Sequence, residues 1–474
     1  MSVFWSKGRC HFAPPFLFRK LIGNFFIYKS PSIPFKQSGK LQGKNIRIDP
    51  HRQPTEIGLL HFILFFVKLH LIIFKGSGAM VEVRLKKGKE KAVRQFHPWV
   101  FSGAIDFLPA KVEDGELVTV TDYTGSFLAK GFYNNRSRVA VRLLEWNPNT
   151  EIEEQWWRKR IQKALQSRHD LLNHAETNTY RLIFSEADFL PGLIADRYAD
   201  YISVQILTSG IERVKAIVLD ELQQQLKPKG IFDRSDSSAR AHEGMAPSYG
   251  TLSGSEPPEY VEVRENGVRY YINIAEGQKS GFFCDQRENR RIVANHAPGK
   301  KVLDCFSYSG GFTLNSLKMG AEKVISIDSS ALAIETLRRN IKLNDFENMH
   351  HEAIQSDVNK QLRAFREKDE KFDLIILDPP KYAPSRSALD KASRAYKDLN
   401  RLAMLLLEPG GLLATFSCSG AVDLAYFKQI IAWAALDAGK EVQFIYQFCQ
   451  PEDHPVRASF PEGEYLKGLL CRIL

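Results

Sequence analysis

The chain has 474 residues, more than one hydrophobic core usually organises, so two to four domains are expected. Hydrophobic residues make up 44% of the sequence and charged residues 25%, which excludes a disordered or fibrous protein. The six cysteines are scattered without a CxxC pair. This spacing argues against a disulfide framework or a zinc site, and it predicts a reducing compartment and no metal.

The positive charge is concentrated at one end of the chain. Residues 1–79 hold 12 of the 65 Lys and Arg residues but only 2 of the 55 Asp and Glu residues, so residues 80–474 carry no net charge. A negatively charged partner such as a nucleic acid would therefore have to meet a local basic face of residues 80–474.

Residues 1–79 differ from the rest in being basic, aromatic-rich and without clear periodicity. They include an apolar run of 17 residues at 58–74, with Lys68 inside it. A membrane-spanning helix needs about 20 apolar residues, and an internal lysine costs about 2.5–3.5 kcal/mol. Three alternatives are open for residues 1–79. They are a membrane anchor, an extra domain, or a non-native or disordered extension that precedes a natural start at Met80. The abrupt change of pattern at Met80 favours the extension. No membrane contact is expected unless residues 58–74 are part of the native protein and insert into a bilayer.

Residues 80–150 contain short apolar strands separated by turn signals, a spacing typical of a small β-barrel. The predicted strands are Val81–Leu85, Leu117–Thr121, Phe127–Gly131 and Val139–Leu143. A basic cluster follows the first strand and is either a solvated loop or a phosphate-contacting patch. Its members are Lys86, Lys87, Lys89, Lys91 and Arg94.

Residues 151–275 alternate between helical and strand patterns and predict a central α/β domain. A charged helix is expected over 151–177 and a strand over Tyr201–Ile206. An amphipathic helix is expected over Ile211–Leu226, because its apolar residues recur at helical spacing. Residues 261–274 read as a hairpin turning at Asn266-Gly267.

Residues 276–474 repeat a strand-then-helix pattern, which predicts a parallel, doubly wound sheet. The predicted strands are Lys301–Cys305, Lys323–Ile327, Leu374–Leu377 and Leu412–Phe416. The predicted helices are Gly311–Met319, Ala331–Leu343, Ser393–Leu407 and Val422–Ala438.

A nucleoside site is predicted at the first turn of this sheet. Asp304 ends a strand, Gly310 opens a helix, and Asp328 ends the next strand, where an acid can accept both ribose hydroxyls. Phe306 and Tyr308 stand where a dinucleotide-binding turn would carry glycines, which disfavours a nicotinamide dehydrogenase. A nucleoside without phosphates, such as S-adenosylmethionine, fits this turn better.

Two further strands deliver reactive groups to the same rim, because ligands of open α/β sheets bind beyond the carboxyl ends of the strands. One ends in Asp378-Pro379-Pro380, and the other delivers Cys418 between two serines. This pairing predicts a group-transfer enzyme with Cys418 as nucleophile, although a strand-end cysteine can also be a small buried residue. Cys305 and Cys284 are weaker candidates, and Cys449 and Cys471 are predicted to be core residues.

The sequence from 80 to 474 resembles the bacterial 23S rRNA (cytosine-C5) methyltransferases that carry an N-terminal PUA domain, and 277–474 resembles class I S-adenosylmethionine-dependent methyltransferases. The resemblance implies a PUA-like RNA-binding barrel at 80–150, a central α/β domain at 151–275, a Rossmann-like catalytic domain at 276–474, and a homodimer acting on large-subunit ribosomal RNA in the cytoplasm. The family usually has glycine where this chain has Phe189. The matching segments are Ser185–Leu193, Gly277–Arg287, Asp304–Phe312, Asp378–Lys381, Ser417–Ser419, Asp453–Val456 and Glu464–Gly468.

The implied chemistry is addition of the Cys418 thiolate to C6 of cytosine, which makes C5 nucleophilic enough to take a methyl group. Asp378 and Pro379 would shape the pocket, and either Glu464 or Asp378 would accept the C5 proton. The predicted cofactor-binding residues are Phe282, Asp304, Ser307, Gly310, Asp328, Ser329, Asp357, Val358, Asp378 and Pro379.

Some alternatives stay open at this point. The Gly277–Arg287 segment is either a charged surface loop or a lid over the cofactor or RNA, and His454 is predicted to be structural. Methylation at another position, such as guanine N7, would make Cys418 a bystander. A non-catalytic RNA-binding protein would retain the barrel and an inactive Rossmann-like fold.

Overall fold

The first folded region is a small β-barrel-like sheet whose alternating apolar residues close over one core. The computed structural model describes residues 80–109, 111–277, 281–383 and 386–474, so the expectations for residues 1–79 lie outside it. The six strands are ordered β2-β6-β5-β4-β1-β3, and α3 covers Lys91–Arg94. Their bounds are β1 Val81–Leu85, β2 Trp99–Phe101, β3 Ile105–Phe107, β4 Leu117–Thr121, β5 Phe127–Tyr133 and β6 Val139–Glu145.

The central region is a five-stranded sheet in the order β11-β10-β9-β8-β7, with helices packed against it. Its strands are β7 Thr179–Phe184, β8 Leu193–Tyr198, β9 Tyr201–Ile206, β10 Gly230–Ser235 and β11 Ser248–Gly254. Its helices are α4 Glu154–Leu171, α5 Ser209–Arg213, α6 Lys215–Leu226 and α7 Ser238–His242. The single helix expected over Ile211–Leu226 is wrong, because the chain breaks at Val214 between α5 and α6.

The hairpin appears as predicted, with β12 Val261–Glu265 paired to β13 Val268–Ile272. Asn266 and Gly267 both have positive φ (49° and 72°), as a two-residue hairpin turn requires. Phe189, in the place of the usual family glycine, also has a left-handed backbone, with φ of 61°. Residues with a Cβ adopt this conformation only at a cost, so the surrounding contacts must hold Phe189 in it.

The C-terminal region is a seven-stranded sheet in the order β16-β15-β14-β17-β18-β20-β19, with β20 antiparallel to both neighbours. Its strands are β14 Lys301–Cys305, β15 Lys323–Asp328, β16 His351–Gln355, β17 Phe372–Leu377, β18 Leu407–Ser417, β19 Val442–Cys449 and β20 Lys467–Ile473. Its helices are α8 Arg287–Ala294, α9 Gly311–Lys318, α10 Ala331–Leu343, α11 Val358–Glu367, α12 Leu389–Leu406 and α13 Leu424–Ala438.

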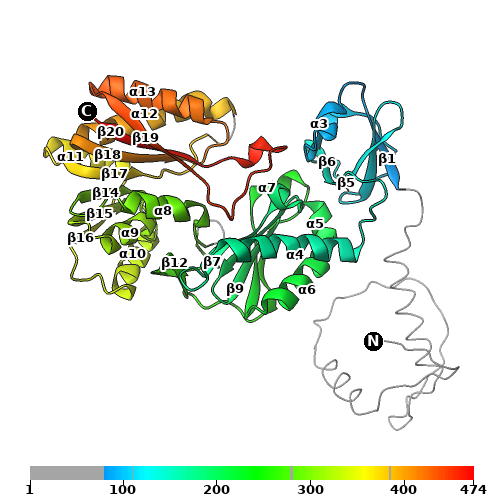
Figure 1. Ribbon diagram of the computed structural model, residues 1–474, viewed down its shortest axis with the longest axis horizontal. Helices are drawn as coiled ribbons and strands as arrows, with labels where there is room; N and C mark the ends of the chain where they lie inside the picture. Colours follow the sequence, from blue (N-terminus) through cyan, green and yellow to red (C-terminus); the bar gives the residue numbers. More distant parts are fainter. Residues whose placement is uncertain (1–79, 110, 278–280, 384–385) are drawn as a thin grey trace, which may run out of the picture. The chain divides into compact units, whose positions relative to one another are not determined.

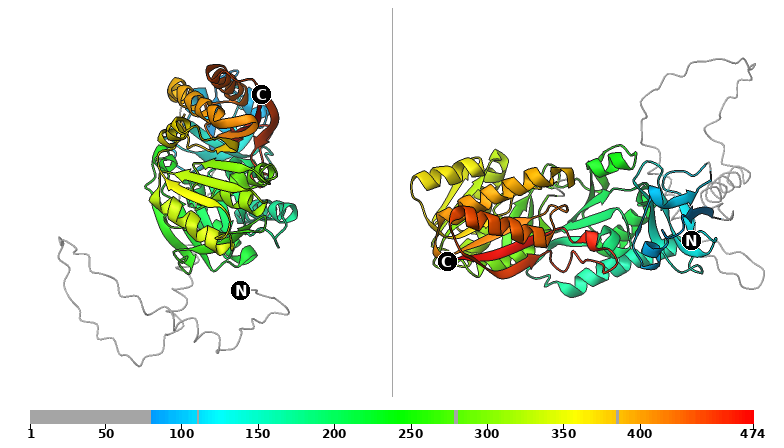
Figure 2. Two further views of the ribbon diagram at one scale, coloured as in Figure 1. Left: turned by 90° about the vertical axis from the view of Figure 1, so that its left-hand side faces the viewer. Right: turned by 90° about the horizontal axis from the view of Figure 1, so that it is seen from above.

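Helices cover both faces of this sheet, which explains why its central strands are continuous apolar runs. One core joins α11, α12 and α13 to one face, and another joins α8, α9, α10 and the hairpin to the opposite face. Figures 1 and 2 show these helices packed on the two sides of the strands. The prediction that Cys449 is a core residue is wrong, because β19 is an edge strand and Cys449 is exposed.

The described residues all belong to one compact unit that spans Gly76–Leu474. Asp453 holds its central and C-terminal regions together: its Oδ2 accepts from the Arg181 backbone N–H at 2.9 Å and from Arg287 Nη1 at 2.8 Å. Its backbone oxygen accepts from Arg168 Nη2 at 3.2 Å. Among the described residues, no helix is long and apolar enough to cross a bilayer.

Candidate active site

The turn between β14 and α9 is built from left-handed backbone. Phe306, Tyr308 and Gly310 have φ values of 63°, 47° and 89°. Gly310 cannot be replaced without cost, because a Cβ there would lie 2.1 Å from Cδ1 of Leu337. The aromatic residues at 306 and 308 thus adopt a left-handed backbone although both carry a Cβ, and their side chains line the adjoining cavity.

Asp304 supports this turn from behind. It is 1% exposed, and its Oδ2 accepts from the backbone N–H of Thr313 at 3.0 Å and from Thr313 Oγ1 at 2.6 Å. Burial, reinforced by the carboxylates of Asp378 and Asp328, raises the pKa of Asp304 to about 7. Asp304 does not line the cavity, so its contacts fix the start of α9 on β14.

Asp328 ends β15 at the rim and faces the cavity together with Ser329. Its Oδ2 accepts from the Tyr308 backbone N–H at 3.0 Å, and its Oδ1 accepts from the Ser330 backbone N–H at 2.9 Å. These bonds hold the carboxylate at the mouth of the turn, where a ribose can reach it.

Asp357 and Val358 lie at the start of α11. Asp357 caps this helix by accepting the Lys360 backbone N–H at 2.9 Å, and Val358 is 3% exposed. Neither residue lines the cavity, so the structure does not bring them to the other candidates, and their contact with an adenine stays a prediction.

A cavity of about 520 Å³ brings together most of the predicted residues. Ser307 and Ser309, at the turn, have hydroxyls with no hydrogen-bond partner among the described residues, although both side chains are buried. Buried hydroxyls without partners are costly and are suited to a polar ligand. The predicted residues that line the cavity are Phe282, Ser307, Asp328, Ser329, Asp378, Pro379 and Cys418.

Cys418 follows β18 and is partly exposed in this cavity. Its serine neighbours are fully buried and bind one tyrosine: Ser417 Oγ donates to the Tyr396 hydroxyl at 3.0 Å, and the hydroxyls of Tyr396 and Ser419 lie 3.2 Å apart. The Ala383 backbone N–H donates to Ser419 Oγ at 3.1 Å. The serines therefore fix the backbone on both sides of Cys418 and tie it to the loop that follows Asp378-Pro379-Pro380.

Lys467 is a buried cation that the sequence did not single out. It is 5% exposed, and its Nζ donates to the backbone oxygens of Ser419 at 2.8 Å and Val422 at 2.6 Å. Burial lowers the pKa of Lys467, while the nearby Cys418 and Glu464 act in the opposite direction. The sequence could have pointed to Lys467 through its position within the Glu464–Gly468 motif. Only the pairing of β20 with β18, however, places Lys467 beside Cys418.

Glu464 does not line the cavity, whereas its neighbours Tyr465 and Leu466 do. The Tyr465 hydroxyl donates to Asp285 Oδ2 at 2.6 Å. Of the two candidate bases, the structure brings only Asp378 into the cavity with Cys418.

The segment before α8 is not a solvated surface loop over its described part. Phe282, Asp285 and Arg287 are buried, and Phe282 lies against the guanidinium of Arg290 at 4.7 Å. Arg290 in turn forms a buried ion pair with Glu265 at 2.7 Å. The arginine charges are thus internal and paired, and Arg290 holds Phe282 in the cavity wall.

His454 is structural, as predicted. It is 1% exposed, and its Nδ1 lies 3.1 Å from Asp453 Oδ1. Burial raises the pKa of Asp453, but His454 and Arg287 outweigh it and hold that pKa well below its usual range. The pair belongs to the joint between the central and C-terminal regions rather than to the cavity.

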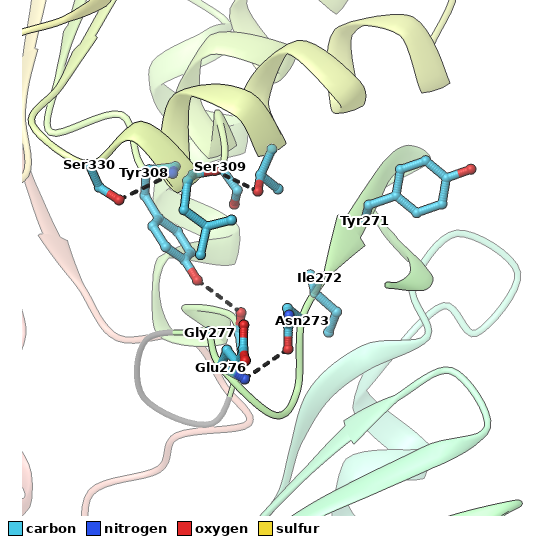
Figure 3. Close-up of a pocket in the computed structure, with 12 residues that line it drawn as sticks. Tyr271, Ile272, Asn273, Glu276, Gly277, Tyr308, Ser309 and Ser330 are labelled. Carbon is cyan, nitrogen blue, oxygen red and sulfur yellow. Dashed lines mark hydrogen bonds between the residues drawn. The ribbon is translucent and has the colours of Figure 1, made fainter. Parts of the chain in front are cut away.

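A smaller cavity of about 160 Å³ adjoins the first one and shares Tyr308 and Ser309 with it. Figure 3 shows it between the end of the hairpin, with Tyr271 and Asn273, and the helix that follows Ser330. The Tyr308 hydroxyl donates to the Gly281 backbone oxygen at 3.3 Å across its floor. It contains no thiol, so the candidate reactive groups all lie in the larger cavity.

Comparison with known families agrees with this geometry. A PUA-like domain matches residues 83–146, and an S-adenosylmethionine-dependent methyltransferase matches residues 240–457. A solved structure of a putative SAM-dependent methyltransferase from Streptococcus mutans shares the fold, with a TM-score of 0.72 at 21% identity over 83% of this chain and 100% of that chain. A putative methyltransferase complexed with SAH has a TM-score of 0.73 at 21% identity and the same coverage.

Curated relatives are closer in sequence. The Ribosomal RNA large subunit methyltransferase I of Aliivibrio fischeri is 43% identical over 394 residues, which cover 83% of this chain and all of that protein. The protein of the same name from Escherichia coli is 41% identical with the same coverage. The predicted mixed α/β fold, with a PUA-like domain and a Rossmann-like methyltransferase domain, is confirmed, and so is the cofactor. The chain belongs to the S-adenosylmethionine-dependent methyltransferase family whose members are named Ribosomal RNA large subunit methyltransferase I.

Proposed function

We propose that the protein methylates C5 of a cytosine in large-subunit ribosomal RNA, with Cys418 as a covalent nucleophile. The observation that supports this most is the cavity, where Cys418 faces the same space as Asp328 and Asp378. A thiol beside the cofactor residues is needed for C5 chemistry, and it has no role in methylation at guanine N7. The substrate class, large-subunit ribosomal RNA, is inferred from the names of the relatives given above.

S-adenosylmethionine, when bound, supplies an electrophilic methyl group. Asp328 would hold its ribose, and Ser307 and Ser309 offer hydroxyls beside it. Phe282, held by Arg290, would close the wall of the cavity and exclude water.

Cys418 would act twice. Its thiolate would form a bond to C6 of the cytosine, and the electron pair of the C5–C6 double bond would then take the methyl group at C5, with S-adenosylhomocysteine as the leaving group. Asp378 removes the proton from C5, the double bond re-forms, and the bond between sulfur and C6 breaks to return the thiolate. Lys467, beside Cys418, would favour the thiolate because a nearby positive charge stabilises it.

Loss of the thiol is the direct test. The full chain and its Cys418→Ala variant would be given labelled S-adenosylmethionine and large-subunit ribosomal RNA, and the RNA would then be digested to nucleosides. We expect labelled 5-methylcytidine with the parent chain and none with the variant. Cys449→Ala is the matched control, because Cys449 is an exposed thiol outside the cavity, and it should retain activity.

Equal binding of S-adenosylhomocysteine by the parent chain and the Cys418→Ala variant would show that the variant is folded. A different methylated nucleoside, made equally well by Cys418→Ala, would reject the C5 mechanism and favour another position. The homodimer and the cytoplasmic location implied by the family resemblance remain predictions.

A further inference from the structure

Helix α4 uses its arginines and its lysines differently. Arg158 pairs with Glu154, Asp220 and Glu221 at 2.6–2.8 Å. Arg160 and Arg168 likewise pair with acidic side chains. Lys159 and Lys163 are exposed, and neither has a carboxylate within 4.0 Å in the part of the chain that the structure describes. The arginines therefore stabilise the fold, whereas the charges of these two lysines remain available to a ligand.

Both lysines line a groove of about 740 Å³ between α4, the end of α6 and the strands β7 and β8. Arg197 adds a third cation, and no Asp or Glu is among its lining residues. Because residues 80–474 carry no net charge, a groove with this one-sided lining is a local basic face of the kind that an anionic polymer needs.

The side chains that form the walls of the groove are held by hydrogen bonds that leave the groove lysines unpaired among the described residues. Gln162 and Gln225 both donate to Oε1 of the buried Glu221, at 2.7 and 2.8 Å. Arg197 Nε donates to the Ala199 backbone oxygen at 2.9 Å, which directs its guanidinium. Two acids lie behind lining glutamines: Glu221 is paired with Arg158, and Asp170 Oδ1 accepts from Gln166 Nε2 at 2.7 Å.

An aromatic stack borders the same groove. His169 lies parallel to His174, with ring centroids 4.8 Å apart and an interplanar angle of 16°, and His174 in turn contacts Tyr180 at 5.6 Å. Basic groups beside aromatic faces suit a nucleic acid strand, whose phosphates and bases they contact respectively.

We propose that this groove of the central domain binds the sugar-phosphate backbone of the RNA substrate, as a contact separate from the catalytic cavity. The inference rests on the proposed function for the identity of the RNA. It gives the central domain a role in substrate binding, in addition to the RNA-binding role expected of the PUA-like domain. Such backbone contacts position an RNA without reading its sequence.

The test removes three positive charges from the groove in the full chain, as Lys159→Gln, Lys163→Gln and Arg197→Gln together. Binding of a fluorescently labelled large-subunit ribosomal RNA fragment would be followed by anisotropy across a salt series. Each lost phosphate contact reduces the slope of log K against log salt by about 0.7–0.9, so a reduction of about 2 is expected. At low salt, we expect the Kd to rise at least about tenfold, alike for fragments of different sequence.

The matched control removes three exposed cations elsewhere, as Lys360→Gln, Arg366→Gln and Lys368→Gln at helix α11. It makes the same change in net charge and should shift the slope much less. A charge-preserving Lys159→Arg and Lys163→Arg variant should bind as the parent chain does, which separates charge from packing.

Equal affinity and slope for the groove variant and the control would overturn the proposal. A groove variant that changes the oligomeric state, measured by light scattering, would assign the groove to a second copy of the chain instead. Failure of the parent chain itself to bind ribosomal RNA would reject the proposed function. That result differs from equal binding by the two variants and from a change of oligomeric state.

Discussion

The turn after β14 and the loop after β18 both deliver functional groups to one cavity, yet they are built differently. The first turn is held mainly by its own segment and by the next strand: Gly310 opens α9, Asp304 binds Thr313 at its start, and Asp328 at the end of β15 accepts from the Tyr308 backbone N–H. The loop at Cys418 is held by side chains from distant elements, Tyr396 from α12 and Lys467 from β20. A local turn can be recognised in a sequence, whereas a loop with distant supports becomes apparent only when the sheet is assembled.

The largest effect should come from breaking the first turn at Gly310. Gly310→Val adds a Cβ that meets Leu337 and imposes a β-branched residue at φ of 89°. We expect the free energy of unfolding, measured by urea denaturation, to fall by about 3–5 kcal/mol, with loss of S-adenosylhomocysteine binding. Gly439→Val is the control, since φ is 64° there but no atom lies within 4 Å of its Cβ. A similar loss at Gly439 would mean that backbone strain alone explains the effect.

A smaller effect is expected at the second loop when its buried cation is removed. Lys467→Met keeps the length of the side chain but deletes the charge beside Cys418. Alkylation of Cys418 at pH 7 should slow about tenfold, because the thiolate loses a nearby positive charge. In a plot of alkylation rate against pH, the midpoint should move to higher pH. The rate of methyl transfer at pH 7 should also fall.

Lys428→Met, on α13, is the control for Lys467→Met, because the Lys428 Nζ contacts Gln447 rather than the cavity loop. It should leave the alkylation profile unchanged. An unchanged profile for Lys467→Met would reject the role of this cation. If alkylation slowed but methyl transfer stayed normal, Lys467 would stabilise the Cys418 thiolate without contributing to the proposed reaction.

A pH-dependent effect on stability is also expected at the first turn. The pKa of Asp304 is raised by burial to about 7, above its unfolded value of about 3.9. Its contribution to stability is therefore fully present below pH 3.9 and is lost as pH rises through 7. Asp304→Asn keeps the acceptor for Thr313 without this titration.

Between pH 5 and pH 8, the parent chain should therefore lose about 2–3 kcal/mol of unfolding free energy relative to the Asp304→Asn variant. Urea denaturation of both proteins at the two pH values measures this difference directly. Parallel stability profiles would show that Asp304 does not titrate in this range.

The sequence anticipated the strands and helices that surround the first turn with little error. The strand Lys301–Cys305 and the helix Ala331–Leu343 occur with the predicted bounds. Their apolar spacing and caps are local properties: Ser330, for example, accepts the Ala333 backbone N–H at the start of α10. The left-handed backbone of Phe306 and Tyr308 was not predicted, because residues with a Cβ rarely adopt it.

The predictions that depended on distant contacts succeeded less often. Cys449 was expected in the core, but an apolar strand has the same pattern at an edge as in the middle of a sheet. Glu464 was expected at the rim, but the cavity is lined by the residues that follow it. The break at Val214 and the left-handed Phe189 likewise depend on what packs against them.

By itself, the sequence determined the α/β class, the cofactor turn and the candidate nucleophile, because each depends on periodicity or on a short motif. Tertiary structure alone decided that Lys467 lies beside Cys418 and that Asp378, rather than Glu464, shares its cavity. It also decided that Lys159 and Lys163 share a groove with Arg197. The physical reason is that strand order and helix packing bring together side chains that are far apart in the chain, and no local pattern records those partners.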